Sequence, residues 1–180
     1  GSIAYKNLRA AFAGEKTRRE LKAIARRSIQ SIAVSCVELL RIPDMNEEYI
    51  RKHVTIEGRE KFEPYAREGK GMIFLTAHFG SWELLNIFSG LIGYPIVALA
   101  RVQKHPRSDA FLNDLRRSKG SQVIHKGMPI REILRALRQG RIVGILSDQD
   151  GGRSGTFVDF FKRRSSTPNG VAKFALKTGA

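Results

Sequence analysis

The chain has 180 residues, of which 42% are hydrophobic, and this suffices for one domain with a sizeable core. Lys and Arg number 32 against 17 Asp and Glu, and the resulting formal charge of +15 indicates an anionic partner, such as a membrane surface, a phosphorylated lipid, nucleic acid or an acidic protein. One cysteine excludes an intrachain disulfide, and the Cys and His residues lack the spacing of a zinc site.

The first third of the chain is predicted to be mainly helical. Helices are expected at residues 3–12, 15–40, 46–52 and 59–67, with a strand at 54–57. In the second helix, a face expected to dock on the core carries Leu21, Ala25, Ser28, Ile32, Cys36 and Leu39. A basic face carries Arg19, Lys22, Arg26 and Gln30. This face is expected either to lie in solvent or to bind an anionic membrane surface. We expect residues 1–52 to form an N-terminal helical segment beside a core at 53–180.

The rest of the chain alternates strands with helices. Strands are expected at 72–75, 94–100, around 123–124, and at 142–146, with helices from residue 82, at 108–118 and at 130–138. This order predicts an α/β fold, a mostly parallel sheet flanked by helices, with ligands outside the strand ends. A last strand, 157–161, carries Phe157, Phe160 and Phe161, interpreted as core residues or the lining of an acyl-chain groove. Residues 165–168 are expected to cap a final helix at 169–177.

His78 lies where the strand at 72–75 should give way to a helix. Glu83 follows five residues later, about 140° around a regular helix, so a contact between them requires a bend. With His78 in the turn and Glu83 in the first helical turn, the carboxylate could hold one ring nitrogen and leave the other as a base. A strand end and a favourable charge at a helix N-terminus explain the same pair without catalysis.

Two further groups of charged residues follow predicted elements. Asp148 and Asp150 come after the strand at 142–146, where α/β enzymes carry functional residues, and two carboxylates one residue apart would suit a metal-dependent transferase or hydrolase. No further acidic residues cluster there, so no metal is expected. Arg116 and Arg117 end a predicted helix, where each is either a phosphate ligand or a cation that interacts with the helix dipole.

Four segments resemble, in the same order, blocks of the bacterial lipid A biosynthesis (late) acyltransferase family, within the glycerolipid acyltransferase superfamily. The first contains the H-x4-E/D motif, and the four read LTAHFGSWELL from residue 75, FLNDLRRSKGSQVIHKG from 111, ILRALRQGRIVGILSDQDGG from 133 and GTFVDFFKRRSSTPNGVAKFALKTGA from 155. Members usually begin with a membrane-spanning segment and continue past the equivalent of Ala180. The resemblance therefore implies a partial chain of a protein at the cytoplasmic face of the bacterial inner membrane.

The resemblance also implies an activity. An O-acyltransferase of lipopolysaccharide biosynthesis would move an acyl chain from an acyl carrier protein thioester to a hydroxyl of a phosphorylated glycolipid, a lipid A precursor, without metal or cofactor. His78 would be the general base and Glu83 its orienting partner. Five further positions are expected to bind substrate: Arg116, Arg117, Arg101, Asp148 and Gly80. The resemblance implies a phosphate at Arg116, and backbone amides near Gly80 could stabilise the oxyanion.

Alternatives remain at this point. The acceptor could be another phospholipid or a phosphatidylinositol mannoside, and the donor could be acyl-CoA. A nucleic-acid-binding module would explain the charge, but no zinc-finger or RNA-recognition motif is present, and nucleic acid is not the expected partner.

Overall fold

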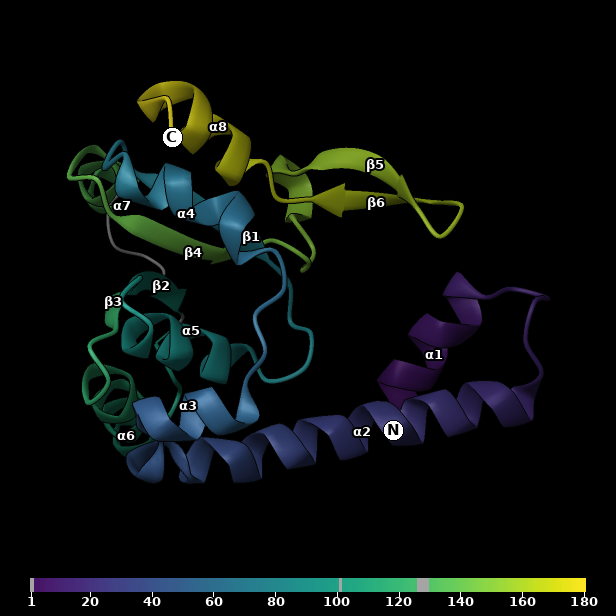
Figure 1. The fold of residues 1–180 in the computed structure, drawn as a ribbon. Helices are drawn as coiled ribbons and strands as arrows, with labels where there is room; N and C mark the ends of the chain where they lie inside the picture. The colour runs from purple at the N-terminus through teal and green to yellow at the C-terminus, as the bar shows by residue number, and fades with distance from the viewer. Residues whose placement is uncertain (1, 101, 126–129) are drawn as a thin grey trace.

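The structure is a computed structural model that describes residues 2–100, 102–125 and 130–180. A four-stranded parallel sheet forms its centre, with strands β1 (Met72–Thr76), β2 (Ile96–Ala100), β3 (Gln122–His125) and β4 (Ile142–Leu146) in the order β1-β4-β2-β3 (Figure 1). Short Val-, Ile- and Leu-rich runs are typical of strands covered by helices on both faces. The predicted α/β fold is confirmed.

Helices α7 (Ile130–Arg138) and α8 (Gly170–Thr178) cover one face of the sheet. On α7 the buried residues are spaced three and four apart, which directs one stripe toward the strands. The cluster between these helices and the sheet has Val97, Ile133, Ala136, Leu137, Val143 and Ile145 as its buried members. The hydrophobic core of the sheet lies here.

A second core cluster surrounds α5 (Trp82–Leu91) and α6 (Pro106–Arg117). Right-handed connections from β1 to β2 and from β2 to β3 place these two helices opposite α7, because the connection from β3 to β4 runs back across the sheet. The buried members are Ile42, Met45, Leu84, Ile87 and Leu115. Two of them precede residue 53, so the N-terminal segment contributes directly to this core.

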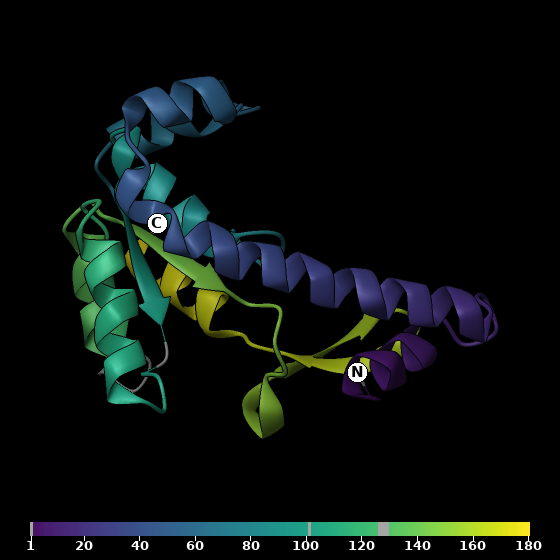
Figure 2. The same ribbon diagram turned by 90° about the horizontal axis from the view of Figure 1, so that it is seen from below.

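The N-terminal segment consists of α1 (Ser2–Ala11), the long α2 (Arg18–Leu40), the 3₁₀ turn η1 (Ile42–Asp44), α3 (Glu47–His53) and α4 (Arg59–Arg67). A capping box begins α2: the Glu20 N–H donates to Thr17 Oγ1 at 3.3 Å, and the Thr17 N–H donates to Glu20 Oε2 at 2.7 Å. The C-terminal end of α2 packs near α5 and α3, while its other end carries α1 away from the sheet (Figures 1 and 2).

Several local predictions were wrong. Residues 54–57 form no strand, and they connect α3 to α4 instead. On α2 only Leu21 and Ala25 are buried, whereas Ile32 and Cys36 are exposed, because the middle of this helix extends past the core. The phenylalanines at 157, 160 and 161 are likewise exposed and do not belong to the core, while their role in an acyl-chain groove stays a prediction.

After β4 and the 3₁₀ turn η2 (Gly152–Ser154), the chain forms an antiparallel hairpin of β5 (Thr156–Phe160) and β6 (Arg163–Thr167). Residues 165–167 were expected to cap the last helix, but they pair with β5.

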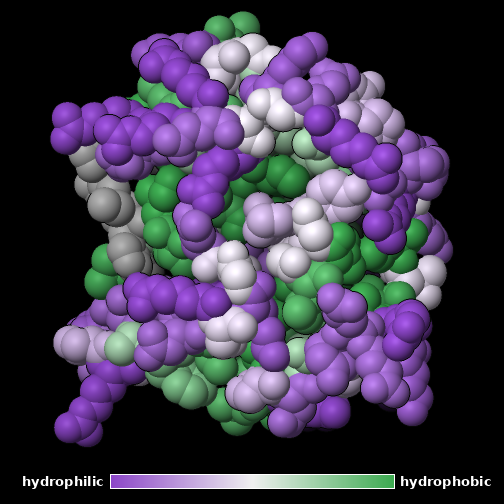
Figure 3. Space-filling view, turned by 60° about the vertical axis from the view of Figure 1, so that its left-hand side comes forward, coloured by the Kyte–Doolittle hydropathy of each residue, from purple (hydrophilic) through white to green (hydrophobic). Residues whose placement is uncertain are grey.

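Viewed from the side on which α6 and α7 come forward, hydrophobic residues lie set back in the middle of the surface between hydrophilic rims (Figure 3).

Candidate active site

The parallel register of β1 and β4 determines the site. Thr76 and Leu146, the last residues of these strands, are partners, and the Ser147 N–H donates to the Thr76 carbonyl at 3.3 Å. His78 lies two residues past the end of β1, and Asp148 lies two residues past the end of β4. The two chains therefore leave the carboxyl edge of the sheet side by side, at the same level.

Asp148 contacts His78 at two points. Its Oδ1 lies 2.7 Å from His78 Nδ1, and its Oδ2 accepts a hydrogen bond from the His78 backbone N–H at 2.8 Å. The Trp82 ring packs edge-on against the imidazole, with centroids 5.1 Å apart. Together these contacts fix both the ring and the turn that carries it.

The contact with Asp148 directs the Nδ1 proton of His78 toward the carboxylate. Burial raises the pKa of Asp148, but the hydrogen bonds from the His78 ring and backbone outweigh it and lower the pKa overall. An ionised carboxylate accepts from Nδ1–H, which leaves the lone pair on Nε2. About a third of each side chain is exposed, 33% for His78 and 36% for Asp148. A histidine held in this way can take a proton from a bound molecule.

Glu83, the partner that the sequence suggested for His78, is engaged elsewhere. Arg116 Nε donates to Glu83 Oε2 at 2.9 Å and Arg116 Nη2 donates to Oε1 at 2.5 Å, so the guanidinium binds the carboxylate at two points. The predicted contact between His78 and Glu83 is absent: the carboxylate at His78 Nδ1 belongs to Asp148, and the catalytic role of Glu83 stays a prediction. The physical reason is that α5 directs Glu83 toward α6, whereas Asp148 directly follows β4, the strand next to β1.

Arg116 is part of a hydrogen-bonded network and is not an exposed, unpaired cation. Its Nη1 donates to Asn113 Oδ1 at 3.0 Å, Asn113 Nδ2 donates to Asp109 Oδ2 at 3.0 Å, and Asp109 Oδ1 accepts from the Gln103 N–H at 2.8 Å. Arg116 is 6% exposed. The network ties α5 and α6 to the segment after β2, and the phosphate role of Arg116 stays a prediction.

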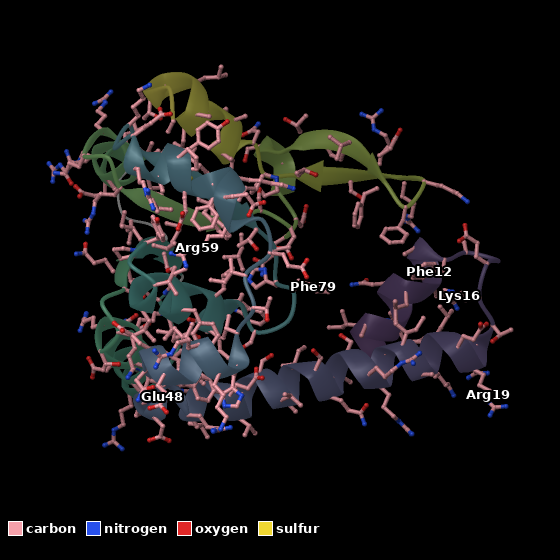
Figure 4. The ribbon with its side chains drawn as sticks, viewed as in Figure 1. Phe12, Lys16, Arg19, Glu48, Arg59 and Phe79 are labelled. Atoms are coloured by element: carbon pink, nitrogen blue, oxygen red, sulfur yellow. The ribbon has the colours of Figure 1, made fainter. Side chains whose placement is uncertain are left out.

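The turn between His78 and α5 brings two further groups to the site. Gly80 has φ of +58°, which a residue with a Cβ rarely adopts, and its carbonyl accepts from Ser35 Oγ of α2 at 3.4 Å. Phe79 is 89% exposed and lies at the outer end of the turn (Figure 4).

The remaining predicted residues are more peripheral. Arg117 is exposed and pairs with Asp114 at 3.3 Å. Asp150 Oδ1 accepts from the Gly152 N–H at 3.0 Å and thereby stabilises the turn before β5. Arg101 lies outside the described residues. Within the described ranges, no three His, Cys, Asp or Glu side chains gather as metal ligands would.

These observations define an α/β domain with a histidine–carboxylate pair at the carboxyl edge of a parallel sheet. All 180 residues match the family described as bacterial lipid A biosynthesis acyltransferase, and the chain belongs to this family.

Curated relatives carry two kinds of name. The phosphatidylinositol mannoside acyltransferase of Mycobacterium tuberculosis is 26% identical over 160 residues, which cover 85% of this chain and 50% of the relative. The lipid A biosynthesis palmitoleoyltransferase of Escherichia coli is 27% identical over 181 residues, covering 99% of this chain and 58% of the relative. The chain thus spans about half the length of the relatives it matches. Among its described residues, no helix is both long and apolar enough to cross a membrane.

Proposed function

We propose that this chain carries the catalytic base of an acyltransferase that moves a fatty acyl group from an acyl carrier protein thioester to a hydroxyl of a lipid A precursor. Membership of the family supports acyl transfer. The observation that carries the proposal is the two-point contact between His78 and Asp148 at the carboxyl edge of the sheet.

In the proposed reaction, His78 Nε2 accepts the proton of the acceptor hydroxyl as its oxygen attacks the thioester carbonyl. The tetrahedral intermediate collapses to the ester and releases the carrier thiolate, which takes the proton back from the imidazolium. Asp148 stabilises that imidazolium and fixes the Nδ1–H tautomer. The N–H groups of the first turn of α5, next to Gly80, have no partners within the helix and would stabilise the oxyanion.

Glu83 and Arg116 have a positioning role in this proposal. Their ion pair holds the N-terminal turn of α5 against α6, and this turn immediately follows the loop that carries His78. Arg117, whose side chain is exposed and pairs with Asp114, is the freer candidate for a phosphate of the acceptor.

The proposed partners are anionic, as the net charge of +15 favours. The acidic carrier protein and the cytoplasmic face of the bacterial inner membrane would meet basic surfaces, among them the exposed face of α2 with Arg19, Lys22 and Arg26. Acyl-CoA remains the alternative donor. A phosphatidylinositol mannoside is the alternative acceptor, since relatives of both names match at similar identity.

A transfer assay with the full-length protein tests the proposal. It should use acyl carrier protein thioester with either a lipid A precursor or a phosphatidylinositol mannoside. His78→Ala should lower kcat by roughly 10² to 10⁴, the usual contribution of a general base, while the thermal midpoint stays near that of the wild type. Near-normal transfer by a folded His78→Ala protein would refute the mechanism. Transfer to the phosphatidylinositol mannoside alone would mean that the mannoside, and not a lipid A precursor, is the acceptor.

A further inference from the structure

The β5–β6 hairpin projects from the body of the protein as a two-stranded ribbon. All five residues of β5 are exposed, and in the described part of the chain neither strand pairs with a third. Figures 1 and 2 both show the ribbon running away from the sheet toward α1. A two-stranded hairpin on its own is only marginally stable in water. We therefore expect the residues of this hairpin to have a role besides its folding.

The turn of the hairpin concentrates aromatic and cationic side chains. Phe160 and Phe161 are 63% and 45% exposed, and Lys162 and Arg163 follow directly. We call these four residues the aromatic tip. Phenylalanines this exposed are unfavourable in water, whereas aromatic and basic side chains together are typical of segments that enter a membrane interface.

The backbone of the aromatic tip is in a conformation that its side chains do not favour. Phe161 and Lys162 have φ of +51° and +57°, and they form the two-residue turn between the paired residues Phe160 and Arg163. Turns with positive φ at both central positions are normally built from Asn-Gly. A phenylalanine and a lysine at these positions imply that the side chains themselves have a role.

The aromatic tip is fixed to the N-terminal helices. The Phe161 ring packs edge-on against Phe12, with centroids 5.1 Å apart, and Lys162 Nζ lies 2.6 Å from Glu15 Oε1. Lys16 lies over the Phe12 ring at 5.3 Å, and Phe12, Lys16 and the start of α2 are seen together below the tip in Figure 4. The tip is thereby held next to the basic first turns of α2.

The aromatic residues point to both faces of the ribbon. Phe157 and Phe160 are three positions apart on β5, and because side chains alternate they lie on opposite faces. A rigid partner, such as a nucleic acid strand, would contact one face only. A fluid apolar layer can receive exposed side chains on either face of a ribbon, although Phe12 of the N-terminal segment covers part of the tip at Phe161.

We propose that the aromatic tip inserts into the interfacial region of an anionic lipid bilayer, with Phe160 and Phe161 among the upper acyl chains and Lys162 and Arg163 at the headgroups. The inference rests on the proposed function in one respect, namely that a lipid bilayer is the surface that this protein meets. The hairpin leaves the same edge of the sheet as Asp148, so insertion would hold His78 on the membrane side of the domain.

A fluorescent label reports insertion without any acyl transfer. In a Cys36→Ser background, which removes the exposed native thiol, a nitrobenzoxadiazole label on Phe160→Cys should shift to the blue with phosphatidylglycerol vesicles. Lipids carrying a quencher on the acyl chain should reduce its emission. The matched control is the same label on Glu48→Cys, an exposed site on α3 far from the tip (Figure 4), which should show neither effect.

A second variant removes two of the four tip side chains, those of Phe161 and Lys162, and keeps the turn. Phe161→Asn combined with Lys162→Gly supplies the residues that this turn prefers, so the hairpin should stay folded. Sedimentation with phosphatidylglycerol vesicles should weaken by about tenfold or more, since one buried phenylalanine and one lysine at an anionic surface are each worth about a factor of five to ten. Phosphatidylcholine vesicles should bind the wild type much less.

Three outcomes would overturn the proposal: a label at 160 that stays in water while the protein sediments with vesicles, a turn variant that binds vesicles as tightly as the wild type, or tight binding to DNA with none to vesicles. Because these measurements contain neither donor nor acceptor, they can fail while the His78→Ala assay succeeds, and the reverse is equally possible.

Discussion

Glu83 and Arg116 form a two-point ion pair between α5 and α6, with side chains only 20% and 8% exposed. The pair joins the first turn of the helix after His78 to the last turn of α6. A carboxylate and a guanidinium this buried are each costly without the other. The ion pair therefore couples the stability of the domain to the geometry of the turn that carries His78.

Arg116→Ala should destabilise the protein by about 3 kcal/mol, because it leaves the Glu83 carboxylate without its cation. Urea unfolding measures this as a lower midpoint with an unchanged slope. Arg117→Ala is the matched control: its side chain is 67% exposed, and the change should stay within about 0.5 kcal/mol of the wild type. Unchanged stability of Arg116→Ala, together with selective loss of phosphorylated acceptor, would instead make Arg116 a phosphate ligand.

Gly71→Ala should destabilise the start of β1 by more than about 1 kcal/mol. Gly71 has φ of +87°, and a Cβ there would lie 2.2 Å from the Leu137 carbonyl oxygen, which belongs to the backbone of α7. Gly69→Ala separates the cost of the positive φ from the cost of the clash, since Gly69 also has positive φ, +66°, but open space around its Cβ position. Thermal unfolding should place Gly69→Ala between the wild type and Gly71→Ala. Equal losses for the two variants would mean that the clash is relieved.

The sheet could be predicted from the sequence because its strands are short, apolar and separated by helix signals. The strand expected at 142–146 and the helices expected at 59–67 and 130–138 have the observed limits. β6 was missed for a physical reason: it is polar throughout, and the turn before it contains Phe161 and Lys162 instead of Gly or Asn. Exposure of Ile32 and Cys36 was not predictable, since periodicity shows which residues share a face and not whether anything covers that face.

The sequence did not predict which residues of the candidate site contact one another. His78 and Asp148 were both singled out because each follows a buried strand. Their contact depends on β4 lying next to β1, and local patterns in the sequence do not determine strand order. Glu83 was the nearer carboxylate in the sequence, and proximity along the chain favoured it.

The stability of the protein should depend on Asp148 in a defined pH window. Its pKa is lowered in the folded state, so the ionised carboxylate contributes stability above its ordinary pKa of about 4, and this contribution is lost as the pH falls through the lowered value. Asp148→Asn lacks this contribution. The difference in thermal midpoint between wild type and Asp148→Asn should narrow as the pH falls below about 4. A difference that is the same at pH 3 and pH 7 would contradict the ionised contact.

Catalysis should distinguish the two carboxylates near His78. Asp148→Asn retains the shape of the side chain but removes the charge that stabilises the imidazolium, so kcat should fall by roughly 10² to 10⁴. The double variant His78→Ala, Asp148→Asn should be little slower than His78→Ala alone, because the carboxylate acts through the ring. Glu83→Gln should lower stability and activity together, and a compensating Arg116→Gln should recover part of both if Glu83 acts only by positioning α5. Should Glu83→Gln abolish transfer in a fully stable protein while Asp148→Asn remains active, Glu83 would be the partner of His78 during the reaction, and the contact with Asp148 would belong to the resting state alone.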